Sequence, residues 1–341
     1  MKKKKVLVFL LAVSLIVTTA FSLTGCGKKT EPAATNQTAP AGEAAQKIRV
    51  GIFATVCEVP IFAAYEKGFF KAEGLDVELI RGDANTLKEG LATGKIDATD
   101  GVLMQWIKPI EQGLDVKFTA GIHTGCIQVL VPPNSNIKTV KDFKGKTIGV
   151  TGIGGGPMNL VSRVLADNGV DLKNDVTWKA YPAAELELAL EKGEVDIISL
   201  PDPVAQLIVN KGKAVKFIDM AKDEPYKSEY CCLVVQNGKF LRENPEKSAA
   251  VTRAILKAAE WVSKNPEEAA KLSVDNKYVP GDYKVNADIL AGYNYQPSVD
   301  GGEKALAIAA KKMQEIGILD PSTNTDELAK KTFVRQPGVN Y

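Results

Sequence analysis

The sequence has few of the residues on which catalytic and metal centres depend. It holds a single histidine, and its five cysteines form no Cys-x-x-Cys pair, which is the spacing typical of zinc and redox motifs. A Ser-His-Asp triad or a metal cluster needs several convergent partners, and one histidine without ligand-spaced carboxylates supplies few of them. The sequence therefore gives little support to an enzyme, and we expect neither a metal nor a cofactor.

The chain also lacks an excess of charge of either sign. Its 341 residues include 43 basic and 41 acidic ones. Four lysines, at positions 2–5, belong to an N-terminal leader; without them 39 basic residues remain against 41 acidic ones, a net charge of −2. Nucleic-acid binding needs concentrated positive charge, and no basic face or tail stands out. We therefore expect no nucleic-acid partner.

Long hydrophobic runs are absent except near the N-terminus. Residues 6–20 are apolar, and a run of about 15 residues is short for a membrane span but typical of a signal peptide. The run ends in Leu-Thr-Gly-Cys26, which resembles a bacterial lipobox. An ordinary signal peptide with a chance cysteine is the alternative.

The lipobox resemblance implies cleavage after residue 25 and a diacylglycerol on the Cys26 thiol, with a further acyl chain such as palmitate on its amine. Two or three chains anchor a protein stably. We therefore expect a lipoprotein held at the extracytoplasmic face of the cell membrane. Residues 26–46 contain little to bury and are expected to form a disordered tether.

Beyond residue 46, strand-like and helix-like segments alternate, which indicates doubly wound parallel sheets. The first set comprises strands at 48–53, 75–80 and 96–99 and helices at 60–70 and 86–93. The second comprises strands at 147–150, 176–181 and 195–198 and helices at 157–168 and 184–191. The pattern Leu-x-x-x-Leu-x-x-Gly-x-Ile/Val-Asp occurs at 87–97 and again at 186–196. We therefore expect two similar α/β lobes.

Two β-rich runs, 127–131 and 231–236, lie between these sets and are expected to be the crossing strands. Lobe 1 would then comprise 47–130 and 237–341, and lobe 2 would comprise 131–236. The part of the chain after about residue 237 is expected to be helical, with helices at 245–265, 266–273, 286–292 and 301–317.

Several segments resemble the substrate-binding proteins of ABC importers, in the subgroup for nitrate, bicarbonate, taurine, aliphatic sulfonates and thiamine-pyrimidine precursors. They are PIFAAYEKGFF at 60–70, LATGKID at 91–97 and VKDFKGKTIGV at 140–150, and the likeness extends over about 47–319. The resemblance implies a two-lobed periplasmic-binding-protein fold of type II. It also implies a monomer that captures a small organic or oxyanion solute between its lobes and delivers it to an ABC permease in the membrane.

Ligands of open parallel sheets bind beyond the carboxyl ends of the strands, which nominates the residues that follow each expected strand. The candidate ligand-binding residues are Thr55, Cys57, Glu58, Asp83, Asp100, His123, Thr124, Gly154, Gly155, Gly156, Tyr181 and Asp202. The glycine loop could bring backbone N–H groups close to a ligand, or it could be only a tight turn. Asp100 and Glu58 could instead cap the helices that follow them.

The cysteines after Cys26 allow three interpretations. Cys57, Cys126 and Cys231 are expected near the cleft floor, as buried small hydrophobes, as a disulfide between the crossing strands, or as thiolates facing a ligand or metal. A disulfide could pair Cys126 with Cys231 or with Cys232. Thiamine-precursor binders of the family carry a cysteine-rich stretch, but Cys231-Cys232 lacks its further cysteines. The lone His123 could be structural or could contact the ligand.

Transport is the function that these observations favour. An enzyme similar to the thiamine-pyrimidine synthases is the first alternative, and a sensor lipoprotein is the second. The charge of the solute stays open. A glycine-rich helix start favours an anion, whereas the candidate loops hold acidic side chains and no lysine or arginine, which favours a neutral or amine-bearing solute.

Overall fold

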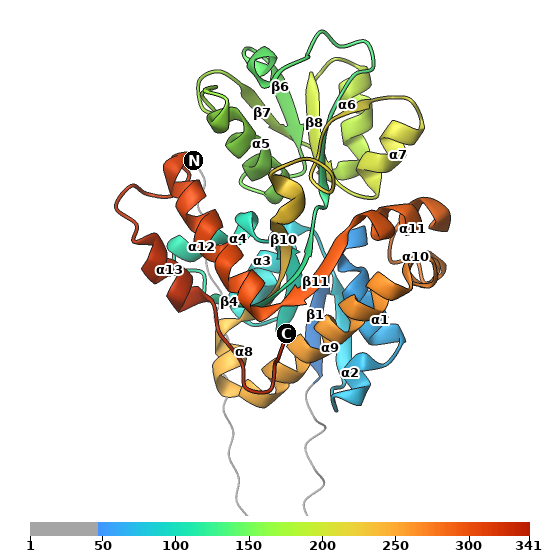
Figure 1. The fold of residues 1–341 in the computed structure, drawn as a ribbon, viewed down its shortest axis with the longest axis vertical. Helices are drawn as coiled ribbons and strands as arrows, with labels where there is room; N and C mark the ends of the chain where they lie inside the picture. The colour runs from blue at the N-terminus through green and yellow to red at the C-terminus, as the bar shows by residue number, and fades with distance from the viewer. Residues whose placement is uncertain (1–46) are drawn as a thin grey trace, which may run out of the picture. The chain divides into compact units, whose positions relative to one another are not determined.

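The computed structural model describes residues 47–341 as an α/β protein with two sheets (Figure 1). One sheet has six strands in the order β11-β4-β10-β3-β1-β2, and the other has five in the order β7-β6-β8-β5-β9. The expected two-sheet α/β class is confirmed. The expected signal peptide, Cys26 and tether fall on residues 1–46 and lie outside the described residues. None of the helices in the range 47–341 is long and apolar enough to cross a membrane.

Lobe 1 is built on the six-stranded sheet. Its strands are β1 (Ile48–Ile52), β2 (Val77–Arg81), β3 (Ala98–Val102), β4 (Val116–Thr124), β10 (Tyr230–Asn237) and β11 (Asn294–Ser298). Strand β1 pairs in parallel with β2 and β3, whereas β10 runs antiparallel to both β3 and β4. Its helices are α1 (Val59–Glu66), α2 (Phe69–Ala72), α3 (Ala84–Thr93), α4 (Met104–Glu111), α8 (Gly238–Glu243), α9 (Pro245–Lys264), α10 (Pro266–Asp275), α11 (Tyr283–Gly292), α12 (Val299–Glu315) and α13 (Thr325–Thr332).

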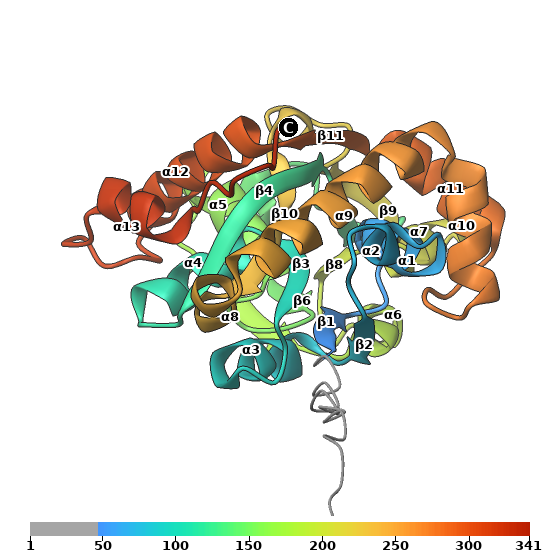
Figure 2. The ribbon, with the colours of Figure 1, turned by 90° about the horizontal axis from the view of Figure 1, so that it is seen from below.

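Lobe 2 is built on the five-stranded sheet. Its strands are β5 (Ile127–Val131), β6 (Thr147–Val150), β7 (Thr177–Ala180), β8 (Ile197–Pro201) and β9 (Val215–Asp219), and its helices are α5 (Gly156–Asp167), α6 (Leu186–Glu191) and α7 (Val204–Asn210). Strand β6 pairs in parallel with β7 and β8, and β5 runs antiparallel to β8 and β9. Figure 1 shows this lobe above lobe 1, and Figure 2 shows α9 lying across the outer side of lobe 1.

Helix α3 illustrates how local sequence sets these elements. The Asp83 carboxylate accepts a hydrogen bond from the Thr86 N–H at 2.8 Å and so caps the helix start. Leu87 and Leu91, one helical turn apart, are fully buried. Gly94 ends the helix at φ +70°, a left-handed conformation that glycine adopts without strain. The expected 86–93 helix is thus present and begins two residues earlier.

The chain crosses between the lobes at other points than the sequence indicated. The run 127–131 lies wholly in lobe 2 as β5, and the run 231–236 lies wholly in lobe 1 within β10. The crossings are instead residues 125–126, where Gly125 has φ +67°, and residues 220–229. Hydrogen bonds hold the run 127–131 beside β8 in the sheet of lobe 2, and they hold the run 231–236 beside β3 in the sheet of lobe 1. The lobe boundaries expected at 130/131 and 236/237 therefore move to these connecting segments.

Two further differences bear on the site. The third strand was expected at 96–99 but extends to Val102, because β10 pairs with it on its other side, with Val234 opposite Asp100. The C-terminal part was expected to be helical throughout, yet it contributes β11, which pairs with β4. Both differences arise from pairing with strands distant in the sequence, which local patterns do not report.

Candidate ligand-binding cleft

A cavity of about 330 Å³ lies where the carboxyl ends of strands from both sheets meet. Lobe 1 supplies the lining after β1 and β2 and from β3, and lobe 2 supplies residues after β6, β7 and β8. The lining residues are Phe53, Thr55, Cys57, Glu58, Gly82, Asp83, Ala84, Asp100, Gly101, Val102, Gln105, Ile127, Thr151, Pro157, Pro182, Ala183 and Pro201. Five of the twelve predicted site residues are among them. The cavity falls at the small end of the usual range for ligand pockets.

Glu58 lies at the start of α1 and is buried. Its carboxyl accepts hydrogen bonds from the Phe53 N–H at 2.6 Å and from the Thr55 N–H and hydroxyl at 2.9 and 3.0 Å. Burial, with the Cys57 thiol beside it, raises the pKa of Glu58 to about 8. The side chain therefore ties the end of β1 to the helix start, which is a local structural role, while it also lines the cavity.

Asp100 lies inside β3 and is completely buried. Neither carboxyl oxygen has a hydrogen-bond partner among the described residues, so Asp100 does not cap a helix, contrary to the alternative left open above. Burial raises the pKa of Asp100 well above its usual range, and the nearby Glu58 and Cys57 act in the same direction. A neutral Asp100 can both donate and accept a hydrogen bond toward the cavity.

The lining contains no lysine, arginine or histidine. Its acidic side chains are Glu58, Asp83 and Asp100. The Trp106 Nε1 has no hydrogen-bond partner among residues 47–341 and lies near Gly101, as does the Gln105 amide. Gln105 and Trp106 are not among the predicted site residues, because both belong to α4 and not to a strand end. Their proximity could be inferred only from how α4 packs against β3.

The predicted residues outside this cavity occupy three places. His123 and Thr124, at the end of β4, are buried behind it. Tyr181 lies at the rim of lobe 2, where its hydroxyl donates to Glu194 at 3.1 Å. Asp202 is buried at a second cavity with Gln128 and Tyr293. It accepts hydrogen bonds from the Gln128 side chain at 2.8 Å and from the Tyr293 hydroxyl at 3.2 Å.

The glycine loop follows β6, but none of Gly154, Gly155 and Gly156 lines the cavity. The Gly154 N–H points to the Met158 sulfur, and the Gly155 N–H donates to the Gly152 carbonyl at 3.1 Å. A Cβ on Gly156 would come within 2.7 Å of Val102 in lobe 1. The loop is therefore a tight turn whose last glycine lets the two lobes approach.

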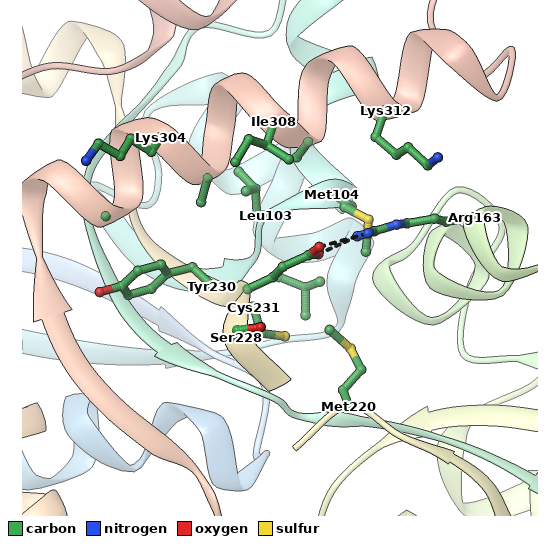
Figure 3. A pocket seen from close by; sticks show the side chains of 15 residues that line it. Leu103, Met104, Arg163, Met220, Ser228, Tyr230, Cys231, Lys304, Ile308 and Lys312 are labelled. Atoms are coloured by element: carbon green, nitrogen blue, oxygen red, sulfur yellow. Dashed lines mark hydrogen bonds and ion pairs between the residues drawn. The ribbon is translucent and has the colours of Figure 1, made fainter. Parts of the chain in front are cut away.

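A separate apolar cavity of about 250 Å³, called the rear cavity below, lies between the start of β10, helix α5 and helix α12 (Figure 3). At its edge Arg163 donates to the Glu229 carboxylate at 2.8 Å, and dashed lines at Arg163 in Figure 3 mark the contact. Lys312 of α12 lies 2.5 Å from Asp167 of α5 and so forms an ion pair between the lobes. Cys231 also lines this cavity.

Comparison with known proteins gives relatives of two kinds. The chain is 29% identical over 331 residues to a Bacillus subtilis (strain 168) protein named for binding aliphatic sulfonates, with 94% and 95% of the two chains covered. It is 26% identical to the nitrate/nitrite binding protein NrtA of Nostoc sp. (strain PCC 7120), covering 68% of this chain but only 58% of that protein. It is also 26% identical over 245 residues to 4-amino-5-hydroxymethyl-2-methylpyrimidine phosphate synthase THI13 of Saccharomyces cerevisiae, covering 65% and 68% of the two.

Solved structures show the same fold at lower identity. The nitrate-binding protein NrtA of Synechocystis PCC 6803 superposes with a TM-score of 0.72 at 17% identity, covering 84% of this chain and 86% of that one. The alkanesulfonate-binding protein SsuA of Xanthomonas axonopodis pv. citri gives 0.71 at 19% identity, covering 85% and 98%. The periplasmic-binding-protein architecture expected from the sequence is therefore confirmed.

The family profile matches residues 58–269, more than half of the chain, and this stretch runs from the start of α1 through both lobes into α10. It includes Glu58, Asp100 and the whole of lobe 2. The resemblance noted in the sequence is thereby confirmed, and the chain belongs to the NMT1/THI5-like family.

Proposed function

We propose that this protein is the extracytoplasmic solute-binding component of an ABC importer. The observation that carries the proposal is the cavity of about 330 Å³ between strand ends of two lobes, in a chain of this family and fold. Two connecting segments, 125–126 and 220–229, join the lobes, and such a connection permits hinge closure around a ligand. Relatives named as nitrate- and sulfonate-binding proteins support the same class of function.

The solute proposed here is a small, neutral or cationic molecule that carries an amine or an amine-substituted heterocycle. Asp100 presents two buried carboxyl oxygens without partners, and an amine can satisfy one or both. Leaving them unpaired costs about 1–3 kcal/mol, so a solute that pairs them gains at least part of that. The Trp106 and Gln105 side chains offer further donors beside the same cavity.

An anionic solute fits this lining poorly. Nitrate and sulfonates are the solutes in the names of two relatives, but the cavity has no basic side chain, and Glu58, Asp83 and Asp100 all line it. The glycine loop offers no free pair of amides at the cavity, since two of its N–H groups are engaged within the loop. An oxyanion would therefore be desolvated without compensating charge.

A solute screen tests this assignment. Isothermal titration with 4-aminopyrimidines, other heterocyclic amines, nitrate and alkanesulfonates should give saturable binding for a nitrogenous solute only. Asp100→Ala should weaken that binding by about 10- to 100-fold, the effect of losing a strong hydrogen bond in a buried site. Asp83→Asn is the matched control, because it lies at the same cavity but is exposed. Tight nitrate or sulfonate binding would contradict the proposed solute class.

We propose binding without catalysis, although synthases are among the relatives. Two of the three carboxyls that line the cavity, Glu58 and Asp100, are buried and have raised pKa values, and hydrogen bonds from them are enough to hold a polar solute. Mass spectrometry of the solute recovered after prolonged incubation with the protein decides the matter. Recovery of unchanged solute supports a receptor, and stoichiometric or catalytic conversion would make the protein an enzyme.

The proposal also includes a lipid anchor at Cys26, a monomeric state and docking on a membrane permease. Cys26→Ser should move the protein from the detergent phase to the aqueous phase in a detergent-partition assay. Co-purification with a permease in the presence of the solute tests the partner. A variant that stays in the detergent phase after leader cleavage would contradict the anchor, and light scattering measures the oligomeric state.

A further inference from the structure

Four cysteines from three separate segments converge at the floor of the cleft. Cys57 follows β1, Cys126 lies in the first crossing segment, and Cys231 and Cys232 open β10. All four are buried, with at most 6% of any residue exposed. Cys126 and Cys231 form a disulfide, whereas Cys57 and Cys232 are free thiols. Cys57 also lines the cleft cavity, and Cys231 lines the rear cavity of Figure 3.

The sulfur spacing matches a metal site. The Cys126 and Cys232 sulfurs are 3.9 Å apart, and the sulfurs of Cys57, Cys126 and Cys232 all lie within 4.8 Å of one another. Thiolates bound to one zinc ion at about 2.3 Å are roughly 3.8 Å apart in tetrahedral geometry. The three sulfurs therefore need to move by only a fraction of an ångström to share one ion.

His123 supplies an independent indication. It is completely buried, and its Nδ1 lies 3.2 Å from the Thr124 carbonyl oxygen, to which it can donate. Its Nε2 has no partner among the described residues. Metal-binding histidines typically donate their other ring N–H to such a carbonyl. The ring stacks on Tyr293 at 5.2 Å and contacts Tyr295 at the same centroid distance, so its orientation is fixed.

Cys232 and His123 lie opposite each other on neighbouring strands. Cys232 pairs with His123 across β10 and β4, so the strand register brings a thiol and an imidazole to one point. A buried thiol beside an imidazole whose Nε2 has no partner among the described residues supplies two of the ligand types that Zn²⁺ prefers.

We propose that, when the Cys126–Cys231 disulfide is reduced, Cys57, Cys126 and Cys232 bind one thiophilic d10 cation, Zn²⁺ or Cu⁺, next to His123. The reduction consumes one dithiol: its two electrons and two protons convert the disulfide to two thiols, and the donor becomes a disulfide. The cation then displaces the thiol protons. Oxidation and metal binding exclude each other, since both use the sulfur of Cys126.

Metal titration of the full-length Cys26→Ser chain tests the site, because the four cluster cysteines are then the only thiols. After anaerobic reduction with a phosphine and removal of the reductant, Co²⁺ should bind one ion per chain with a thiolate charge-transfer band. Zn²⁺ should displace it, and Mg²⁺ should not. The same chain without reduction should bind at least tenfold more weakly, because Cys126 is then bonded to Cys231.

Two adjacent residues of β10 give the matched comparison. Cys231→Ser should retain one ion per chain under reducing conditions: the Cys231 sulfur lies 4.0 Å from the Cys232 sulfur, but it does not belong to the group that includes the Cys57 sulfur. Cys232→Ser should weaken binding at least 100-fold, and Cys57→Ser, on a different element, guards against a folding defect in β10. Circular dichroism checks the fold of each variant. No stoichiometric binding by the reduced chain, or equal binding by Cys231→Ser and Cys232→Ser, would overturn the proposal without touching the proposed solute function.

Discussion

Tyr293 donates its hydroxyl to the Oδ2 atom of Asp202 at 3.2 Å, and this bond joins lobe 1 to lobe 2. Tyr293 lies between α11 and β11, whereas Asp202 follows β8. The Asp202 carbonyl also accepts from the Val56 N–H at 3.2 Å, directly before Cys57. One residue of lobe 2 thus contacts two segments of lobe 1 beside the cleft. We expect these bonds to form and break as the lobes close and open.

The pKa of Asp202 makes this contact sensitive to pH. Burial raises the pKa of Asp202 to about 6, while Gln128, Lys216 and Tyr293 oppose the shift and Asp219 supports it. A carboxyl whose pKa is higher in the folded than in the unfolded chain stabilises the fold at low pH, and this stabilisation is lost as the pH rises through 6.

Asp202→Asn should remove that pH dependence. The wild type should lose about 1 kcal/mol of its free energy of unfolding between pH 5 and pH 7.5 because of this carboxyl, as a pKa near 6 implies, and the variant should not lose it. Urea unfolding at both pH values measures it. Asp83→Asn is the control, because hydrogen bonds from Thr86 lower the pKa of Asp83, which places its titration below this window. A constant difference between wild type and Asp202→Asn would contradict the prediction.

Tyr293→Phe should favour the open form. The substitution removes only the hydroxyl that reaches Asp202 and keeps the ring stacked on His123. Solute binding should weaken by about 2- to 13-fold, because a hydrogen bond contributes about 0.5–1.5 kcal/mol, with little change in the melting temperature of the solute-free protein. Titration calorimetry and thermal melting measure the two. Unchanged affinity would show that the bond is present in both forms.

Gly156 should control how closely the lobes approach. Its Cα faces Val102 across the lobes, and an added Cβ would meet Val102 at 2.7 Å. Gly156→Val should therefore hold the lobes apart, weaken solute binding at least tenfold and leave a larger radius of gyration in X-ray scattering with solute present. Gly152→Ala in the same loop is the control, since its Cβ meets nothing within 4 Å. Equal behaviour of the two variants would refute the role of Gly156.

The local parts of this fold could be predicted because local signals determine them. Strand β6 occupies the expected residues 147–150, and α5 lies within a residue of its expected limits, since a β-branched run and a proline at the helix start mark them. Strand β4 was not predicted, although Val116, Phe118, Ala120 and Ile122 alternate along it and are fully buried. That alternation is the signal that could have found it.

The site depends on contacts that no local pattern encodes. Asp100 lies in a strand because β10, more than a hundred residues away, pairs with it. Tyr293 reaches Asp202 at the second cavity only because β11, which follows it, pairs with β4. The disulfide partner of Cys126 was left open between Cys231 and Cys232, and the structure pairs it with Cys231. Residue types at strand ends pointed to five of the residues that line the cavity, but the convergence of cysteines from separate segments required the tertiary structure.

The ion pair between Lys312 and Asp167 links α12 of lobe 1 to α5 of lobe 2 at the rear cavity. Lys312→Met should weaken solute binding by about 1.5- to 5-fold at low salt, because partly exposed pairs contribute about 0.2–1 kcal/mol. The effect should disappear near 1 M salt, where screening acts over about 3 Å.

Lys304→Met is the matched control, since Lys304 lines the same cavity on the same helix but forms no ion pair within the described residues. Titrations of both variants at two salt concentrations measure this. A salt-independent loss of affinity in Lys312→Met would assign the effect to packing of its side chain. Equal losses in both variants would show that the ion pair does not contribute to closure of the lobes.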